Sequence, residues 1–264
     1  MRKLFYLLIL ATLPMTSIFA QDQNKIVLPL SKQAPNWLKP YQAKYHVYRG
    51  GDKKGSVKRL LAQKNDHWEL YTQSKLSLFF FSDKRTETTT FTFKQRKIIP
   101  LSYSYDVDNS FTHKRTTEFF DWDLKIIKGR RLQKGSWQLP LKKGISNPLS
   151  NQLLIRQYLI NKFPETDKIK FSSPLKLTLQ VSSKGKISSW DYQIKKGEKI
   201  HTNLGEFETV KVIRSHGSRR TLFWLSISHQ FIPVKIYLEK NGKEQGTMVL
   251  AKLKINQKQT ISAL

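Results

Sequence analysis

The C-terminal stretch 203–255 constrains the fold of this chain more than any other part of it. Apolar and polar side chains alternate there with a period of two, which is the pattern of half-buried β-strands. Turn residues separate the extended segments, and Asn241-Gly242 favours a tight hairpin because both residues tolerate a positive φ angle. The pattern predicts a four-stranded antiparallel meander with strands at 207–214, 219–227, 233–239 and 247–255.

The same alternation recurs upstream and predicts strands at 41–49, 57–64, 67–76, 85–94, 97–106, 112–122, 124–128, 131–139, 175–182 and 188–195. One segment has helical spacing instead. Asn147-Pro148 supplies an N-cap and a proline at the first helical position, and residues 161–164 end the helix. We therefore predict a mainly β protein: a single curved antiparallel sheet or a half-open β-barrel, with one α-helix covering an open end.

The N-terminus has the pattern of a secretory signal. Met1-Arg2-Lys3 is a positive start, residues 4–13 are apolar, and Ala20 offers a small residue before a cleavage point. We expect residues 1–20 to be a cleaved signal peptide, 21–40 a proline-punctuated lead-in arm, and 41–264 a single β-rich domain. The chain has no cysteine, which excludes disulfides and an N-terminal lipid anchor. The expected location is the periplasm, without lipidation.

The charge is strongly positive, with 47 Lys and Arg against 19 Asp and Glu and a net charge of +28. The basic residues are interleaved with apolar ones along the strands rather than gathered in a tail. Two interpretations stay open: a solvated basic surface, or a polyanionic partner such as anionic lipid or an envelope glycan. Export argues against nucleic acid. Peripheral contact with a membrane, released by salt, is a further expectation.

Motifs that would indicate a reaction are missing from the sequence. There is no Gly-x-Ser-x-Gly elbow, and the histidines stand singly, without the spacing of a metal site. Carboxylates at Asp106, Asp108 and Asp121 offer an alternative acid/base or cation-binding set. The commoner use of such residues is at strand ends and turns. We expect no cofactor, no metal site and no catalytic residue.

The candidate ligand-binding residues are of three kinds. We expect aromatic side chains on an apolar concave face, with Trp224 also buried in mid-strand, and we expect arginines near one hairpin to bind an anion. We expect an apolar tip to enter a membrane or to line the mouth of an apolar site. These residues are Tyr45, Tyr103, Trp190, Trp224 and Tyr237; Arg214, Arg219 and Arg220; and Phe79, Phe80 and Phe81.

Four segments, in order, resemble a bacterial family known as domain of unknown function 3108. They are Tyr45-His46-Val47-Tyr48 with Gly51 and Gly55; Asn147-Pro148-Leu149-Ser150 with Leu154-Ile155-Arg156; Gly205 to Val212; and Arg220-Thr221, Phe223-Trp224 and Pro233-Val234-Lys235-Ile236. At the place of Asn147 the family often has Asp. The resemblance implies an exported envelope protein with a curved antiparallel sheet and no assigned reaction. Its architecture is similar to the half-barrel carriers and sensors of lipoprotein traffic, a likeness of fold alone.

The sequence therefore favours a non-enzymatic periplasmic protein that binds or carries an apolar or anionic envelope ligand, lipid or glycan. A hydrolase acting on envelope material and a scaffold that binds envelope proteins by its sheet edges are the alternatives.

Overall fold

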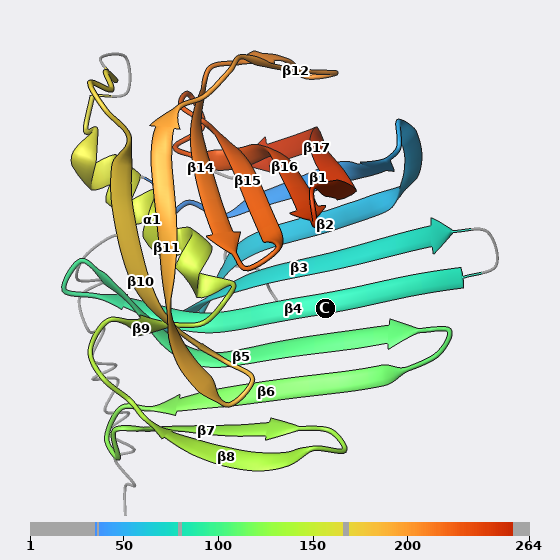
Figure 1. The fold of residues 1–264 in the computed structure, drawn as a ribbon. Coiled ribbons are helices and arrows are strands. Elements are labelled where there is room, and N and C mark those ends of the chain that lie inside the picture. Colours follow the sequence, from blue (N-terminus) through green and yellow to red (C-terminus); the bar gives the residue numbers. More distant parts are fainter. Residues whose placement is uncertain (1–34, 36, 79–80, 166–168, 256–264) are drawn as a thin grey trace, which may run out of the picture. The chain divides into compact units, whose positions relative to one another are not determined.

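The computed structural model of the chain describes residues 35, 37–78, 81–165 and 169–255 (Figure 1). These ranges hold one helix, α1 (Ser150–Lys162), and seventeen strands. The strands are β1 (Tyr41–Arg49), β2 (Asp52–Lys64), β3 (His67–Leu78), β4 (Phe81–Lys94), β5 (Lys97–Asn109), β6 (His113–Asp121), β7 (Ile126–Arg131), β8 (Gly135–Pro140), β9 (Ile145–Ser146), β10 (Leu175–Ser183), β11 (Lys186–Lys196), β12 (Ile200–Thr202), β13 (Gly205–Phe207), β14 (Thr209–His216), β15 (Arg219–Ser226), β16 (Ile232–Lys240) and β17 (Lys243–Ile255).

Fifteen strands form one continuous sheet in the order β8-β7-β6-β5-β4-β3-β2-β1-β17-β16-β15-β14-β11-β10-β9. Each strand is antiparallel to its neighbours except in the short parallel pair β9–β10. The sheet has edges at β8 and β9, so it is not closed into a barrel. The predicted fold class, a mainly β protein with one large sheet and one helix, is confirmed.

Strand β1 joins two runs of sequential hairpins, because it pairs with β2 on one side and with β17 on the other. The predicted C-terminal meander is present as β14–β17. Its first strand begins at Thr209 instead of Phe207, because Phe207 pairs with Ile200 in the separate ribbon β12–β13. The ribbon was not predicted.

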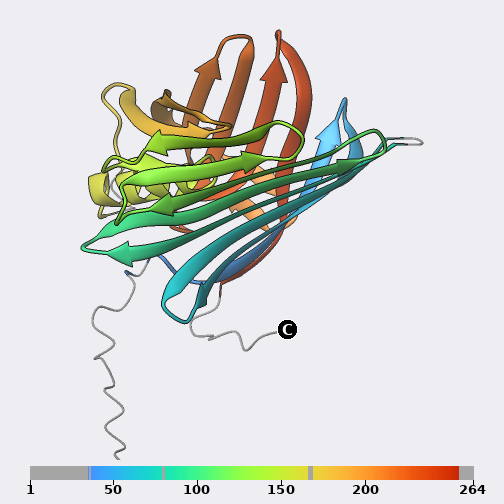
Figure 2. The ribbon, with the colours of Figure 1, turned by 90° about the horizontal axis from the view of Figure 1, so that it is seen from below.

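The sheet curves, and α1 lies on its concave face, where it contacts β2 and β4 in one half of the sheet and β11 in the other (Figures 1 and 2). We call this the inner face. Antiparallel partners point to the same side of a sheet, so the register assigns Tyr45, Val57 and Leu250 to one side of it, and Leu61 and Leu70 likewise. The face is apolar on β1–β4 near the helix and more polar toward the opposite ends of these strands.

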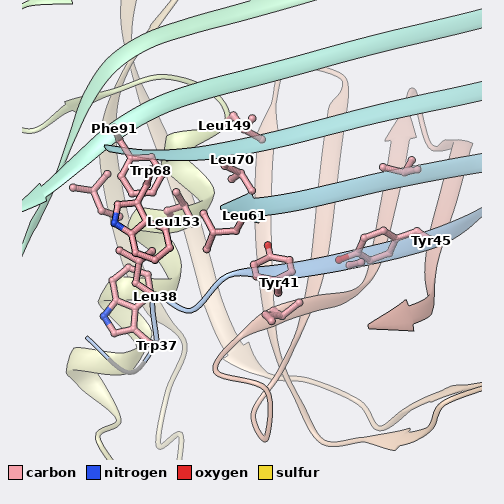
Figure 3. Packing of buried hydrophobic residues seen from close by; sticks show 14 of the residues in the cluster. Trp37, Leu38, Tyr41, Tyr45, Leu61, Trp68, Leu70, Phe91, Leu149 and Leu153 are labelled. Atoms are coloured by element: carbon pink, nitrogen blue, oxygen red, sulfur yellow. The ribbon is translucent and has the colours of Figure 1, made fainter. Parts of the chain in front are cut away.

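The main core lies at the helix end of the inner face (Figure 3). Leu149 and Leu153 belong to the same buried cluster as Leu61, Leu70 and Phe91, all at most 1% exposed. Trp37 and Leu38, from the end of the predicted lead-in arm, are also buried in it. The burial of each side chain of this size contributes about 1.5–3 kcal/mol to the free energy of folding. This end of the sheet is therefore the most strongly stabilised part of the inner face.

Polar side chains fix the helix on the sheet. Asn147 Nδ2 donates to Thr89 Oγ1 (2.8 Å), Arg59 Nη1 donates to Gln152 Oε1 (2.8 Å), and the Tyr192 hydroxyl donates to Asn151 Oδ1 (2.6 Å). We call these three contacts the helix seam. They come from β4, β2 and β11, so the seam connects the helix to strands from both halves of the sheet.

Arg156 is the largest fully buried side chain among the described residues. Its guanidinium donates to the backbone oxygens of Trp37 (3.1 Å) and Gln230 (3.2 Å) and lies 5.6 Å from the ring centres of Trp37 and Tyr41. Burial lowers the pKa of this group. Arg156 thereby ties the segment before β1 and the turn before β16 to the helix.

The helix starts later than predicted. Its first residue is Ser150, and Pro148 lies in the preceding turn. The Asn147 side chain nevertheless acts as an acceptor for this end, from the backbone N–H groups of Leu149 (3.2 Å) and Ser150 (2.8 Å). The predicted N-cap is therefore wrong: Leu149 is the N-cap, without a side-chain cap hydrogen bond, and Asn147 instead accepts hydrogen bonds in the turn that precedes the helix.

We predict that Asn147→Ala lowers the free energy of unfolding by about 1–3 kcal/mol, because it leaves buried donors of the helix start and the Thr89 hydroxyl without this partner. Asn161→Ala, at an exposed position of the same helix, is the control and should change stability by at most about 0.5 kcal/mol. Urea denaturation of both variants gives the comparison, and equal midpoints would contradict the importance of the seam.

Candidate functional site

The strand ends opposite the helix enclose an open cavity of about 710 Å³, here called the large cavity. It lies where α1 no longer covers the inner face. Strands from both halves of the sheet line it: β1–β5 on one side and β15–β17 on the other. The lining residues are Val47, Arg49, Val57, Thr72, Ser74, Leu76, Asp83, Arg85, Glu87, Tyr105, Arg219, Arg220, Thr221, Leu238, Glu239, Lys240, Gln245, Gly246 and Met248.

The large cavity exists because small side chains stand where the core has large ones. On β3, Leu70 faces the core, while Thr72 and Ser74 follow it on the same face and line the cavity. Gly246 is buried on β17 and also lines it. Part of the wall is apolar, because Val47, Val57 and Met248 also line the cavity. The result is a concave site within the usual range for small-molecule pockets.

The charged side chains of the large cavity fall into two groups. Arg85 makes a two-pronged ion pair with Asp83 (2.7 and 2.8 Å), and Arg220 lies 3.6 Å from Glu239. Arg49, Arg219 and Lys240 are exposed and form no ion pair with another described residue. Positive charge is therefore in excess at the cavity.

Glu87 is a half-buried carboxylate of the wall. It accepts a hydrogen bond of 2.7 Å from the Tyr103 hydroxyl. Burial raises the pKa of Glu87, and the Tyr103 hydrogen bond and the charge of Arg59 offset part of that rise. A carboxylic acid with a raised pKa in a cavity is a common feature of functional sites.

The predicted aromatic residues do not all meet in one place. Tyr45 and Tyr103 lie on the inner face but are buried. The Tyr45 hydroxyl donates a hydrogen bond to Pro233 O (2.9 Å), and the Tyr103 hydroxyl donates one to Glu87. Neither lines the large cavity. The aromatic side chain that does line it is Tyr105, two residues along β5 from Tyr103.

Trp224 and Tyr237 lie on the other face of the sheet. The register pairs Trp224 with Lys211 and Lys235, and Tyr237 with Leu222, and these positions alternate with the inner-face positions of β15 and β16. Trp224 is buried as expected. Its indole N–H donates to Glu198, and the ammonium groups of its two lysine partners lie 4.6 and 4.9 Å from its ring centre. The surroundings of Trp224 are those of a structural residue.

The three predicted arginines are divided. Arg219 and Arg220 line the large cavity. Arg214 is half-buried, its guanidinium lies 3.4 Å from the ring centre of Trp190, and burial lowers its pKa. Arg214 and Trp190 thus stack on each other and are not among the lining residues. Of the predicted tip, Phe79 and Phe80 lie outside the described residues; Phe81 begins β4, and its side chain is not described.

The alternative acid/base carboxylates do not enter the cavity. Asp106 and Asp108 flank Val107 on β5, so they point away from the inner face. On that opposite face, Asp106 contacts His113 (3.2 Å). Asp121 stands at the end of β6 and is held by Lys128 (3.2 Å) and the backbone N–H of Leu124 (3.0 Å). Asp106 thus belongs to a surface pair and Asp121 to a turn.

One serine–histidine contact was not anticipated. In the turn after β15, Nδ1 of His229 lies 3.0 Å from Ser226 Oγ and 2.9 Å from Ser228 Oγ. Burial lowers the pKa of His229. Both hydroxyls contact the same ring nitrogen, Nδ1, and none of the described carboxylates contacts Nε2. The arrangement therefore lacks the third group of a catalytic triad.

The described ranges offer neither a metal site nor a membrane-spanning helix. They contain no group of three or more His, Cys, Asp or Glu side chains placed to hold a metal ion. Nor, in those same ranges, is any helix long and apolar enough to cross a membrane.

Comparison with known proteins gives one match. The model of the family described as "Protein of unknown function (DUF3108)" matches residues 41–246, which is most of the chain and includes the strands that line the large cavity up to the start of β17. No curated protein and no solved structure matches the chain. The chain belongs to the DUF3108 family, as the four sequence segments suggested.

We predict that Glu87→Gln stabilises the protein near pH 8, because it removes a carboxylate whose ionised form is penalised by burial. The folded pKa is raised, so the protonated acid contributes stability below the unfolded pKa of about 4.3, and this contribution is lost as pH rises through the folded pKa. The gain of the variant should therefore be larger at pH 8 than at pH 4. Thermal melting at both pH values measures it, and a gain confined to pH 4 would contradict the assignment.

Proposed function

We propose that this member of the DUF3108 family is a non-enzymatic binding protein of the bacterial envelope, which holds the apolar part of an amphiphile in the large cavity. The observation that carries the proposal is the cavity itself: about 710 Å³ on the uncovered end of the inner face, between two halves of one sheet. Ligand sites of this kind are concave, largely preformed and few per protein.

The distribution of side chains suits an amphiphile. Val47 and Val57 on the wall are buried, and Leu76 and Met248 are half-buried beside them. The cations Arg49, Arg219 and Lys240 are exposed. An apolar chain gains from contact with the wall, while an anionic end gains from the cations nearer the solvent.

The net charge of +28 supports the same ligand class. A positive field raises the encounter rate with an anionic ligand or surface and is screened by salt over about 8 Å at physiological ionic strength. Periplasmic location rests on the signal-like pattern of residues 1–20, which lie outside the described residues. It is part of the proposal.

A hydrolase has less support, because the carboxylates of the cavity are engaged. Asp83 pairs with Arg85, Glu87 accepts from Tyr103, and Glu239 is beside Arg220. A scaffold that pairs through its sheet edges would use β8 and β9, but β9 has only two residues, which leaves little backbone for a partner strand.

We predict that Ser74→Trp lowers the affinity for a single-chain amphiphile by at least about tenfold. Ser74 lines the cavity, and an indole there would occupy the space proposed for the chain. The matched control is Lys75→Trp, which places the same side chain on the next residue of β3, exposed on the opposite face. A calorimetric titration of each protein with dodecyl maltoside, below the critical micelle concentration, measures the affinity of the parent and of both variants.

The control variant should bind as the parent protein does. Equal affinities for Ser74→Trp and the parent would exclude the large cavity as the site of the chain. Circular dichroism of each variant checks that the sheet is intact.

A further inference from the structure

A smaller cavity of about 260 Å³, here called the small cavity, adjoins the large one. The two share Arg85 and Tyr105, so the spaces are neighbours along the inner face. Its lining includes four cationic side chains and no carboxylate. The lining residues are Arg85, Tyr105, Val107, Asn109, Thr112, Lys114, Thr116, Arg131 and Lys184.

Strand register brings three of the cations together. Val107 on β5 pairs with Arg85 on β4 and with Lys114 on β6, so these side chains form one row across the inner face. In the next row Thr116 pairs with Tyr105 and with Arg131 on β7. The rows hold cations from three strands that are separated in sequence.

The fourth cation comes from the opposite half of the sheet. Lys184 stands in the β10–β11 turn, where Lys184 and Gly185 have positive φ angles of 54° and 79°. The turn lies against β8, because a Cβ built on Gly185 would be 3.3 Å from the Trp137 ring. The hairpin thus crosses the inner face and brings Lys184 to the cations of β4–β7.

Most of the positive charge of the small cavity is not compensated by an ion pair, although Arg85 is paired with Asp83. Lys114, Arg131 and Lys184 form no ion pair with another described residue. Burial lowers the pKa of Lys184, and the positive charges of Arg131 and Arg219 lower it further. Placing like charges together without an anion costs free energy, which a bound anion would recover.

We propose that the small cavity binds a phosphate-bearing head group, with the chain of the same amphiphile lying in the large cavity. This inference rests on the proposed function. A phosphate monoester carries about −1.5 to −2 charges near pH 7, which suits four cations better than the single charge of a carboxylate. Arginine forks and the hydroxyls of Tyr105, Thr112 and Thr116 supply donors for its oxygens.

The site differs from the arginines expected from the sequence. Arg219 lies close enough to affect Lys184, but Arg214 stacks on Trp190, and Arg220 is beside Glu239. The cations assigned to the head group are Lys114, Arg131 and Lys184, together with Arg85, which already holds Asp83.

Three probes test the assignment: dodecyl phosphate, dodecyl maltoside and inorganic phosphate, each titrated into the full chain by calorimetry. The parent should bind dodecyl phosphate at least about tenfold more tightly than dodecyl maltoside. The double variant Arg131→Gln/Lys184→Gln should lose this preference and keep its affinity for dodecyl maltoside. The control, Arg130→Gln/Lys186→Gln, removes the same charge at neighbouring positions outside the cavity lining and should keep the preference.

The outcomes separate this inference from the proposed function. Equal affinity of the parent for the two amphiphiles would overturn the head-group site and leave the binding function standing. If neither amphiphile binds, the proposed function fails, and the head-group site fails with it. If inorganic phosphate binds as tightly as dodecyl phosphate, the ligand is a free anion and the amphiphile assignment is overturned. Should the double variant not fold, Lys184→Gln alone, in an exposed turn, must weaken the preference for dodecyl phosphate several-fold.

Discussion

The packing of one short helix on one end of the inner face determines the rest of this structure. A sheet with an apolar face must cover that face, and α1 covers one end of it in both halves of the sheet. Leu149 and Leu153 pack with Leu61, Leu70 and Phe91, while Ile155 and Leu159 pack with Tyr192, Ile194 and Val212. The helix seam and Arg156 fix its position by polar contacts with both halves of the sheet. The opposite strand ends stay uncovered, and the large cavity is the consequence.

Much of the fold was predictable because local sequence patterns determine where its strands and its helix lie. Alternation with a period of two identified the meander β14–β17 and most other strands, and Asn147 marked the approximate start of the helix. The closure of β1 against β17 and the crossing of the β10–β11 hairpin are non-local, and no local signal announces them. For the same reason the alternation told which side chains share a face but not which face is concave, so Trp224 and Tyr237 were assigned to the wrong side.

The candidate site was accordingly predicted only in part. Arg219 and Arg220 were identified, because arginines near a turn are visible in the sequence. Arg85, Arg131 and Lys184 come from three distant segments, and in a chain with 47 Lys and Arg no single one of them stands out. What distinguishes them is the lack of any carboxylate in the small cavity, a property that only the arrangement in space reveals.

We propose that the large cavity holds the chain of an amphiphile from the protein's own envelope. Native mass spectrometry of the protein purified from its own cells tests it most directly. We expect a fraction of the molecules to carry a phosphorus-containing amphiphile that is released on activation. This fraction should be lost in Ser74→Trp but not in Lys75→Trp. A protein of bare chain mass, or a ligand retained equally by both variants, would contradict it.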